Sequence, residues 1–239
     1  MRSGVDGRGV RAPAVAWLDV LAKVVLLGFL AVVVIDPEWG HLAGKAPTLR
    51  ALTYPLLAFA VPLWWAVRRP GSPYPWLPDL LLTFTAFSDI LGNRLNLYDR
   101  IRWFDDWMHF ANSTAVTAAL VLLTLHRTVS AVAVLERSVA LGMTAALTWE
   151  LFEYFSFLTR STELPTAYAD TVGDLALGWL GTIAAWLLVH HSWRHHLPPP
   201  AAVSVGLVGL EHELDASVGI VAGVQHLAPE SASSQRAEE

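Results

Sequence analysis

The chain has 239 residues, of which 54% are hydrophobic and 15% charged, and its formal net charge is -5. This apolar composition, with eleven tryptophans, is unusual for a water-soluble domain. The negative charge, without a basic stripe interleaved with aromatic residues, excludes a nucleic-acid-binding protein, and the lack of cysteine excludes disulfides, thiolate metal ligands and cysteine nucleophiles.

Long apolar stretches separated by short polar segments predict an all-α, polytopic membrane protein, because a helix needs about 20 largely apolar residues to cross a bilayer. The first stretch follows several arginines, as a signal peptide does, but it is long and lacks a clear cleavage site, so we expect it to be retained. The third stretch is the shortest and carries Asp79 and Asp89. The predicted spans, about six by the length criterion, cover residues 17–35, 50–67, 77–92, 107–125, 138–158 and 171–191.

These spans divide the chain into an N-terminal arm at residues 1–16, a helical membrane domain at 17–196 and a tail at 197–239. The tail follows three consecutive prolines and is rich in Ala, Val, Gly, Ser and Glu, which predicts that most of it is disordered. Tryptophans cluster near the span ends, where indole rings favour the headgroup zone. Basic residues favour the side of the membrane that holds both termini, by eight to six, which predicts cytoplasmic termini.

Ionisable residues in the predicted spans gather near the helix ends on the extracytoplasmic side. A charged side chain at a helix centre costs about 2.5 to 3.5 kcal/mol on insertion scales, so such residues usually have a role. Asp89 ends the third span, and Asp79 is expected to be an interfacial residue outside the group. Residues three or four apart share a helix face, and the pairs at this spacing are Asp105 and His109, Asp106 and His109, Glu150 and Glu153, and Asp170 and Asp174.

Part of this pattern has a structural explanation. Asp105, Asp106 and Asp170 precede apolar runs, where a carboxylate caps free N–H groups and complements the positive end of a helix. Glu150 and Glu153 instead lie near a helix C-terminus, where the dipole disfavours negative charge. Capping also fails for Asp89, His109 and Asp174. For these residues the structural alternative is pairing with loop arginines, which are Arg94, Arg100 and Arg102.

Carboxylate and imidazole groups from several helices can bind a divalent metal in a bundle. Asp89 and Asp170 would then act as general base or as hydrogen-bond acceptors behind the ligands. Such a site suits a membrane-embedded hydrolase or related enzyme that acts on a lipid-linked or periplasmic substrate. There is no Glu-x-x-His motif, so ferritin-like di-iron chemistry is not supported. The predicted ligands are Asp105, Asp106, His109, Glu150, Glu153 and Asp174.

Two other functions stay open. An ion-coupled carrier would use the same carboxylates to take up protons or cations, and would need polar residues along a path across the bilayer. The opposite half of the bundle offers mainly hydroxyl groups, which favours a one-sided site. A structural or accessory membrane protein would use the polar cluster only to lock helices together. The sequence indicates no oligomeric state.

Five motifs resemble one known family: DILGN at 89–93, the pair Leu97 and Tyr98, FDDWMH at 104–109, WELFEY at 149–154 and YADTVGD at 168–174. They are similar to motifs of the YjdF-like family of bacterial inner-membrane proteins, and the resemblance covers about residues 77–189. It implies a compact multi-pass protein of the bacterial plasma membrane. It implies no catalytic residues, so each role above rests on residue chemistry.

Overall fold

The computed structural model describes residues 11–68, 73–126, 129–156, 158–160 and 164–195. In that part of the chain all regular secondary structure is helical, which confirms the predicted all-α class. The tail at 197–239 and residues 1–10 of the N-terminal arm lie outside the described residues. The first helix begins at Arg11, so it includes the last residues assigned to that arm.

The described helices follow the predicted spans, and each begins earlier in the chain than predicted. The stretch predicted at 50–67 forms two shorter helices in line, and two further short elements lie in the connections. The elements are α1 (Arg11–Ile35), α2 (Pro47–Ala58), α3 (Ala60–Arg68), α4 (Trp76–Arg94), α5 (Leu97–Arg100), α6 (Phe104–Thr124), α7 (Ala131–Ser156), the 3-10 helix η1 (Leu158–Arg160) and α8 (Ala167–His195).

The interruption between α2 and α3 has a local cause. Phe59 leaves the helical conformation, and Pro62 follows three residues later. Proline has no N–H group, so the carbonyl group of Ala58 loses its helical partner, and the proline ring crowds the preceding turn. The chain therefore crosses this region as two helices with one bend.

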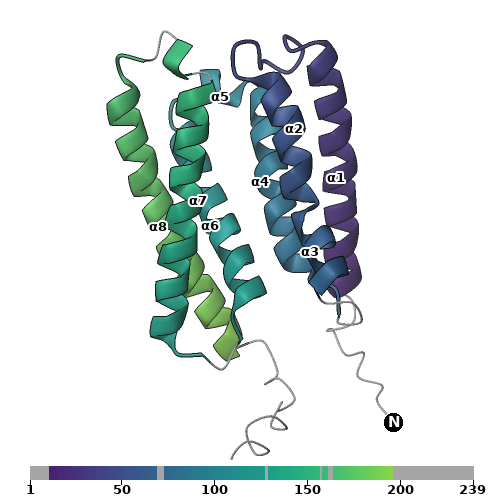
Figure 1. Ribbon diagram of the computed structural model, residues 1–239, viewed down its shortest axis with the longest axis vertical. Coiled ribbons are helices and arrows are strands. Elements are labelled where there is room, and N and C mark those ends of the chain that lie inside the picture. Colours follow the sequence, from purple (N-terminus) through teal and green to yellow (C-terminus); the bar gives the residue numbers. More distant parts are fainter. Residues whose placement is uncertain (1–10, 69–72, 127–128, 157, 161–163, 196–239) are drawn as a thin grey trace, which may run out of the picture. The chain divides into compact units, whose positions relative to one another are not determined.

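The helices form two neighbouring groups (Figure 1). One group contains α1 to α4, in which α4 packs against α1 and α2. The other contains α6, α7 and α8, which pack against one another in all three combinations. Contacts between α4 and α6 join the two groups. The C-terminal ends of α4 and α7 consequently lie at the same end of the bundle as the N-terminal ends of α6 and α8 (Figure 1).

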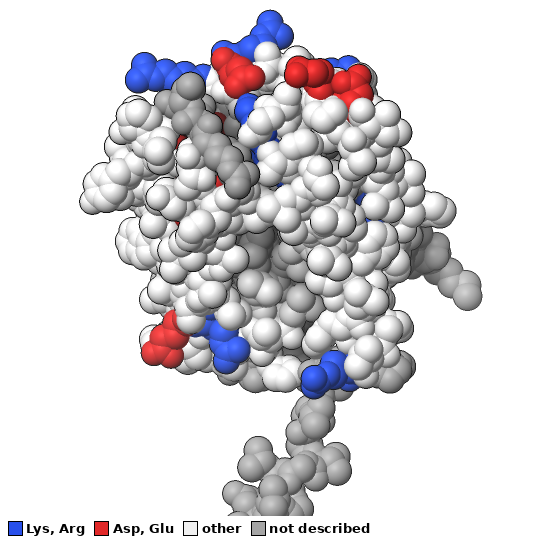
Figure 2. Space-filling model, turned by 45° about the horizontal axis from the view of Figure 1, so that its top comes forward, with Lys and Arg blue, Asp and Glu red and all other residues white. Residues whose placement is uncertain are grey.

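Among the residues that the structure describes, four stretches are long and apolar enough to cross a membrane: Ala14–Ile35, Pro47–Arg68, Ala131–Ser156 and Ala167–Trp193. On the face in Figure 2, charged side chains gather at the two ends, with a wide band of other residues between them. The helices α4 and α6 have sufficient length, but polar residues lower their hydropathy, so the prediction of six spans is not confirmed. Many residues of α4 are buried against protein, where polar groups can find partners and an apolar surface is not required.

Small residues allow α6, α7 and α8 to approach closely. A Cβ atom at Gly181 of α8 would lie 2.6 Å from the backbone oxygen of Phe110 in α6. One at Gly178 would lie 3.0 Å from Cβ of Ala146 in α7, and one at Gly142 would lie 2.4 Å from Oγ1 of Thr117. Helices pack closely in membranes through such small residues. This packing draws the ends of the three helices, which carry the ionisable residues, towards one another.

Candidate functional site

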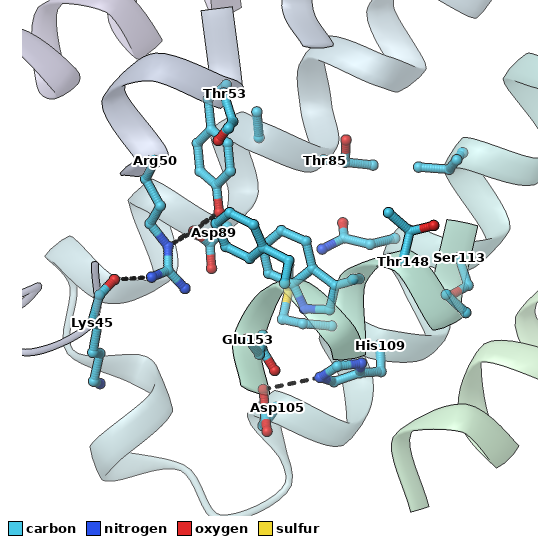
Figure 3. Close-up of a pocket in the computed structure, with 18 of the residues that line it drawn as sticks. Lys45, Arg50, Thr53, Thr85, Asp89, Asp105, His109, Ser113, Thr148 and Glu153 are labelled. Carbon is cyan, nitrogen blue, oxygen red and sulfur yellow. Dashed lines mark hydrogen bonds and ion pairs between the residues drawn. The ribbon is translucent and has the colours of Figure 1, made fainter. Parts of the chain in front are cut away.

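A cavity of about 570 Å³ lies between the two helix groups (Figure 3). Side chains from α2, α4, α6 and α7 form most of its walls, with further residues from α5, η1 and α8, and the α6 residues along it run from Asp105 to Val116. At 1.5 Å per residue, that is a depth of about 16 Å. Below its deepest residues, Val61, Leu82 and Ala119 form a buried apolar cluster. Within the described residues, the cavity is therefore closed towards the opposite end of the bundle.

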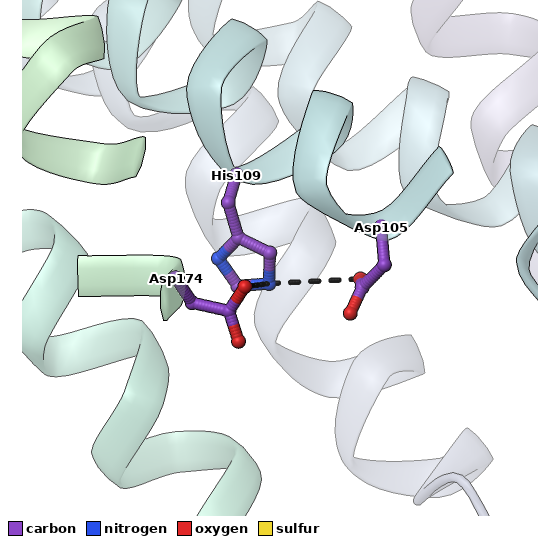
Figure 4. A group of neighbouring side chains, drawn as sticks. All are labelled: Asp105, His109 and Asp174. Atoms are coloured by element: carbon purple, nitrogen blue, oxygen red, sulfur yellow. Dashed lines mark ion pairs between the residues drawn. The ribbon is translucent and has the colours of Figure 1, made fainter. Parts of the chain in front are cut away.

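His109 is the centre of an ionisable cluster on one wall of the cavity. Its Nε2 atom lies 3.6 Å from Oδ1 of Asp105 and 3.7 Å from Oδ1 of Asp174 (Figure 4). Its Nδ1 atom lies 3.3 Å from Oε1 of Glu150. Both ring nitrogens of His109 therefore lie near carboxylate oxygens, and these carboxylates come from α6, α7 and α8.

Two groups of potential metal ligands share this histidine. One comprises Asp105, His109 and Asp174, and the other comprises His109, Glu150 and Glu153. Within each group the ligand atoms all lie within 4.8 Å of one another. Asp105, His109 and Glu153 line the cavity, whereas Glu150 and Asp174 are buried behind the wall. A ligand in the cavity therefore meets at least one carboxylate from each group.

The local sequence explains this convergence. Asp105 and His109 are four residues apart on α6, and Glu150 and Glu153 are three apart on α7, so each pair shares a helix face. Trp149 and Phe152, from the same turns of α7, also line the cavity and stack with their ring centres 5.3 Å apart. Aromatic and carboxylate side chains of α7 therefore form one continuous wall.

Asp89 occupies the wall contributed by α2 and α4 (Figure 3). Its Oδ2 atom accepts hydrogen bonds from Nε of Arg50 at 3.1 Å and from the Tyr54 hydroxyl at 2.5 Å. Its Oδ1 atom accepts from the Tyr98 hydroxyl at 3.1 Å and from the Asn93 amide at 3.3 Å. Burial, together with the Asp89 carboxylate, raises the pKa of Tyr98 well above its ordinary value, so the phenol stays a donor. Both oxygens of Asp89 are therefore satisfied by protein donors.

Sequence reasoning did not select Arg50 or Tyr54 as site residues. Arg50 is only 3% exposed and also donates to the carbonyl oxygen of Lys45, so it is a buried cation and not a loop charge. The structural alternative predicted for Asp89 was pairing with a loop arginine, Arg94, Arg100 or Arg102, whereas the structure pairs it with Arg50. A signal was present, since Arg50 and Tyr54 are four residues apart on one face of an apolar stretch.

A family model described as "Predicted membrane protein (DUF2238)" matches residues 18–195. The chain belongs to this family. The match agrees with the resemblance to YjdF-like proteins, and it includes every helix that contributes to the cavity. No curated protein and no solved structure matches the chain. The DUF2238 protein is thus a membrane protein with helices able to span a bilayer.

The other predicted site residues lie further from His109. Asp106 is exposed in the first turn of α6 and belongs to neither ligand group among the described residues. Asp170 is exposed in the first turn of α8 and lines the cavity. Trp103, the residue before α6, makes no side-chain capping bond, so Asp105 and Asp106 complement the positive helix end by position. Asp79 is buried, with 1% of its surface exposed, and lies outside the His109 cluster.

Proposed function

We propose that this DUF2238 protein binds a divalent metal ion at His109 and is a membrane-embedded, metal-dependent enzyme. The observation that carries the proposal is the convergence of carboxylates from α6, α7 and α8 on both ring nitrogens of one histidine, at the wall of a cavity. Oxygen and imidazole ligands suit Mg²⁺, Mn²⁺, Fe²⁺ or Zn²⁺.

Electrostatics support a bound cation. Asp105, Asp174, Glu150 and Glu153 surround a single imidazole, so even a protonated His109 leaves excess negative charge in the cluster. Carboxylates this close repel one another unless protons or a cation lie between them. A divalent ion supplies two positive charges at the point where the ligand atoms converge, and the two ligand groups give it a choice of positions.

The sharing of His109 fits a known feature of metal sites. A metal-bound histidine usually donates its other ring N–H to a carboxylate, which fixes the orientation of the ring. If the metal binds Nε2 with Asp105 and Asp174, then Glu150 accepts from Nδ1. If it binds Nδ1 with Glu150 and Glu153, the aspartates take that role. Either arrangement uses every member of the cluster.

The cavity supports hydrolysis or a related reaction at one membrane face. A divalent ion acidifies a bound water molecule and polarises an ester or phosphoester oxygen. Asp170 lies at the cavity wall and is our candidate for the general base, whereas Asp89 holds Arg50, Tyr54 and Tyr98 in place. Aromatic and aliphatic residues deeper in the cavity favour a lipid-linked substrate over a fully polar one.

For topology, we propose six spans, in which α2 with α3 counts as one and α4 and α6 complete the set. Both termini then lie in the cytoplasm of a bacterial cell, and the cavity opens to the extracytoplasmic side of the plasma membrane. The distribution of basic residues supports this orientation, and the family resemblance supports the bacterial plasma membrane. The membrane domain predicted at 17–196 would form one unit.

Elemental analysis of the purified protein tests the metal site. We expect about one equivalent of a divalent transition metal or Mg²⁺ in the wild type and a loss of most of it in His109→Ala and Glu150→Ala. Asp106→Ala is the matched control, because Asp106 is the exposed neighbour of Asp105 and lies outside both ligand groups. A wild-type protein that carries no metal after incubation with each candidate ion would contradict the proposal.

An ion-coupled carrier is the second candidate. A separate buried network of Asp19, Lys23 and Asp79 lies between α1 and α4, nearer the other end of the bundle. A carrier needs polar groups on that side as well, whereas a one-sided enzyme does not. Labelling of single cysteines discriminates between the two. If the protein is an enzyme, Thr148→Cys, at an exposed position that lines the cavity, should be accessible from the cavity side, and Leu82→Cys, in the apolar cluster, should be protected from both sides. A carrier exposes Leu82→Cys to the opposite side during its cycle.

A purely structural role predicts a third result. The protein would contain no metal, Leu82→Cys would stay protected, and each substitution in the cluster would lower stability without other effect. The same purified variants therefore separate all three functions.

A further inference from the structure

A second buried ionic network lies between α1 and α4, outside the cavity. Nζ of Lys23 lies 2.5 Å from Oδ1 of Asp19 and 2.8 Å from Oδ2 of Asp79. It also donates to Oγ1 of Thr83 at 2.9 Å, and the Thr83 hydroxyl donates to Oδ1 of Asp19 at 2.9 Å. Asp19 and Asp79 are each 1% exposed and Lys23 is 8% exposed, so the network is removed from solvent.

The charges in this network do not balance. With every group ionised, two carboxylates face one ammonium group, which leaves one negative charge in a buried site. The neighbouring Tyr74 is neutral, and the part of α2 and α3 nearest Lys23 presents the ring of Phe59, whose centre is 6.0 Å from Nζ. Arg68 at the end of α3 has an exposed side chain. An unbalanced charge is costly in this environment, and protonation is the usual way to remove it.

The oxygens of the two carboxylates differ in their partners. Oδ1 of Asp19 accepts from both Lys23 and Thr83. Oδ2 of Asp79 accepts from Lys23 and, at 2.6 Å, from the hydroxyl of Tyr74. Oδ1 of Asp79 is buried and has no hydrogen-bond partner among the residues that the structure describes. A buried carboxylate oxygen without a donor is the place where a proton removes most of the desolvation cost.

We propose that Asp79 is a proton-binding site, at which a proton from the aqueous phase binds Oδ1 and converts the carboxylate into a neutral carboxylic acid. Lys23 and Asp19 then remain as a neutral ion pair, and Oδ2 of Asp79 still accepts from Lys23 and Tyr74. Burial and the hydrogen bond to Asp79 raise the pKa of Tyr74 well above its ordinary value, so the phenol is a donor in both states. This site is independent of the His109 cluster and of any metal bound there.

Infrared difference spectroscopy of the full-length protein in lipid nanodiscs tests the proposal directly. At neutral pH, the wild type minus Asp79→Asn spectrum should contain the carbonyl band of a protonated carboxylic acid, because acids elsewhere contribute equally to both proteins. In an Asp19→Asn background the same subtraction should show carboxylate bands instead, since Asp79 must then ionise to balance Lys23. Glu136→Gln, which removes an exposed carboxylate of α7, is the control and should leave the acid band unchanged.

Thermal unfolding across pH gives a second measurement. The native protein holds a proton on Asp79 that the unfolded chain releases, so stability should fall as the pH rises, and this slope should be lost in Asp79→Asn. Asparagine imitates the neutral acid and needs no proton, so this variant should fold, melt close to the wild type at acidic pH, and melt above the wild type at neutral pH. Failure of Asp79→Asn to fold, or a carboxylate band for Asp79 in the wild type, would show an ionised residue and overturn the proposal. If sodium salts raise the melting temperature above that in choline salts, and Asp79→Asn abolishes this difference, the occupant is a metal cation and the proposal of a bound proton is overturned.

Discussion

At the residue scale, the buried charged side chains around the cavity form two groups, which differ in whether their acidic and basic residues balance. Asp89 and Arg50 form a pair in which both partners are satisfied by additional hydrogen bonds. The His109 cluster has more carboxylates than bases and is not balanced by its own residues. Structural ion pairs are usually complete in themselves, whereas an excess of one sign indicates a ligand of the other. This difference supports the proposal that the first group is structural and the second binds a ligand.

Chelation should reveal the metal as a stability effect. A metal that binds only the native state adds stability by mass action, so a strong chelator should lower the melting temperature of the wild type. Glu150→Gln and Glu153→Gln should respond little, because they have lost ligands, and Asp106→Asn should respond as the wild type does. A melting temperature that chelator leaves unchanged in all four proteins would remove the metal and leave protons as the compensating charges.

The Arg50 and Asp89 pair should show strong energetic coupling. Removing one partner of a buried pair typically costs about 3 to 5 kcal/mol, because the other charge is left uncompensated. We expect Arg50→Met and Asp89→Asn each to lower the melting temperature strongly, and the double variant to lose less than their sum. Lys45→Gln, which breaks the exposed pair with Asp99, should cost about 1 kcal/mol or less. Additive losses in the double variant would contradict a functional pairing of the two residues.

At the element scale, the position of the cluster depends on how closely α8 approaches α6 and α7. Asp174, Glu150 and His109 belong to different helices, so a shift of one helix changes every ligand distance in the cluster. At Gly181, about two turns along α8 from Asp174, the backbones of α6 and α8 come so close that an added Cβ would lie 2.6 Å from the backbone oxygen of Phe110. Helix packing and site geometry are therefore coupled through a small number of glycines.

Gly181→Ala should disturb both stability and the site. The added Cβ would meet the backbone oxygen of Phe110 at 2.6 Å, and a backbone atom cannot move aside as a flexible side chain can. We expect a loss of about 1 to 3 kcal/mol and a lower metal content. Gly173→Ala on the same helix is the matched control, because a Cβ there would have no neighbour within 4 Å, and alanine favours a helix over glycine by about 1 kcal/mol. Equal effects of the two substitutions would show that close packing at Gly181 is unimportant.

At the scale of the whole molecule, the two ends of the bundle differ. One end carries the cavity, the His109 cluster and the connections at α5 and η1, and an apolar cluster of Val61, Leu82 and Ala119 separates it from the other half. Such asymmetry suits chemistry at one membrane face, because substrate and water need to enter from one side only. The orientation of the protein in the membrane therefore decides to which side the cavity opens.

Single-cysteine labelling should establish that orientation, and the native chain contains no cysteine that would interfere. An impermeant thiol reagent should label Leu97→Cys, near the cavity end, from the extracytoplasmic side only. It should label Ser130→Cys, before α7 at the opposite end, from the cytoplasmic side only. The reverse pattern would invert the orientation and place the cavity at the cytoplasmic face.

The sequence by itself determined the helical class and the membrane environment, because hydrophobic length is a local property that needs no knowledge of neighbours. It also determined the pairs on one helix, such as Asp105 with His109 and Glu150 with Glu153, since helical geometry follows from spacing alone. It selected Asp89 as a carboxylate at a helix end that capping does not explain, but the loop arginines that it offered as an alternative did not include Arg50.

The tertiary structure alone decided which helices meet. Arg50 and Asp89 are 39 residues apart in sequence, and Lys23 and Thr83 are 60 apart, so no periodicity connects them. Which carboxylates share His109 depends on the rotation and close approach of α6, α7 and α8, which glycine contacts between those helices control. Pairing across helices depends on distances of a few ångströms between side chains on different elements, and these distances exist only once the bundle has packed.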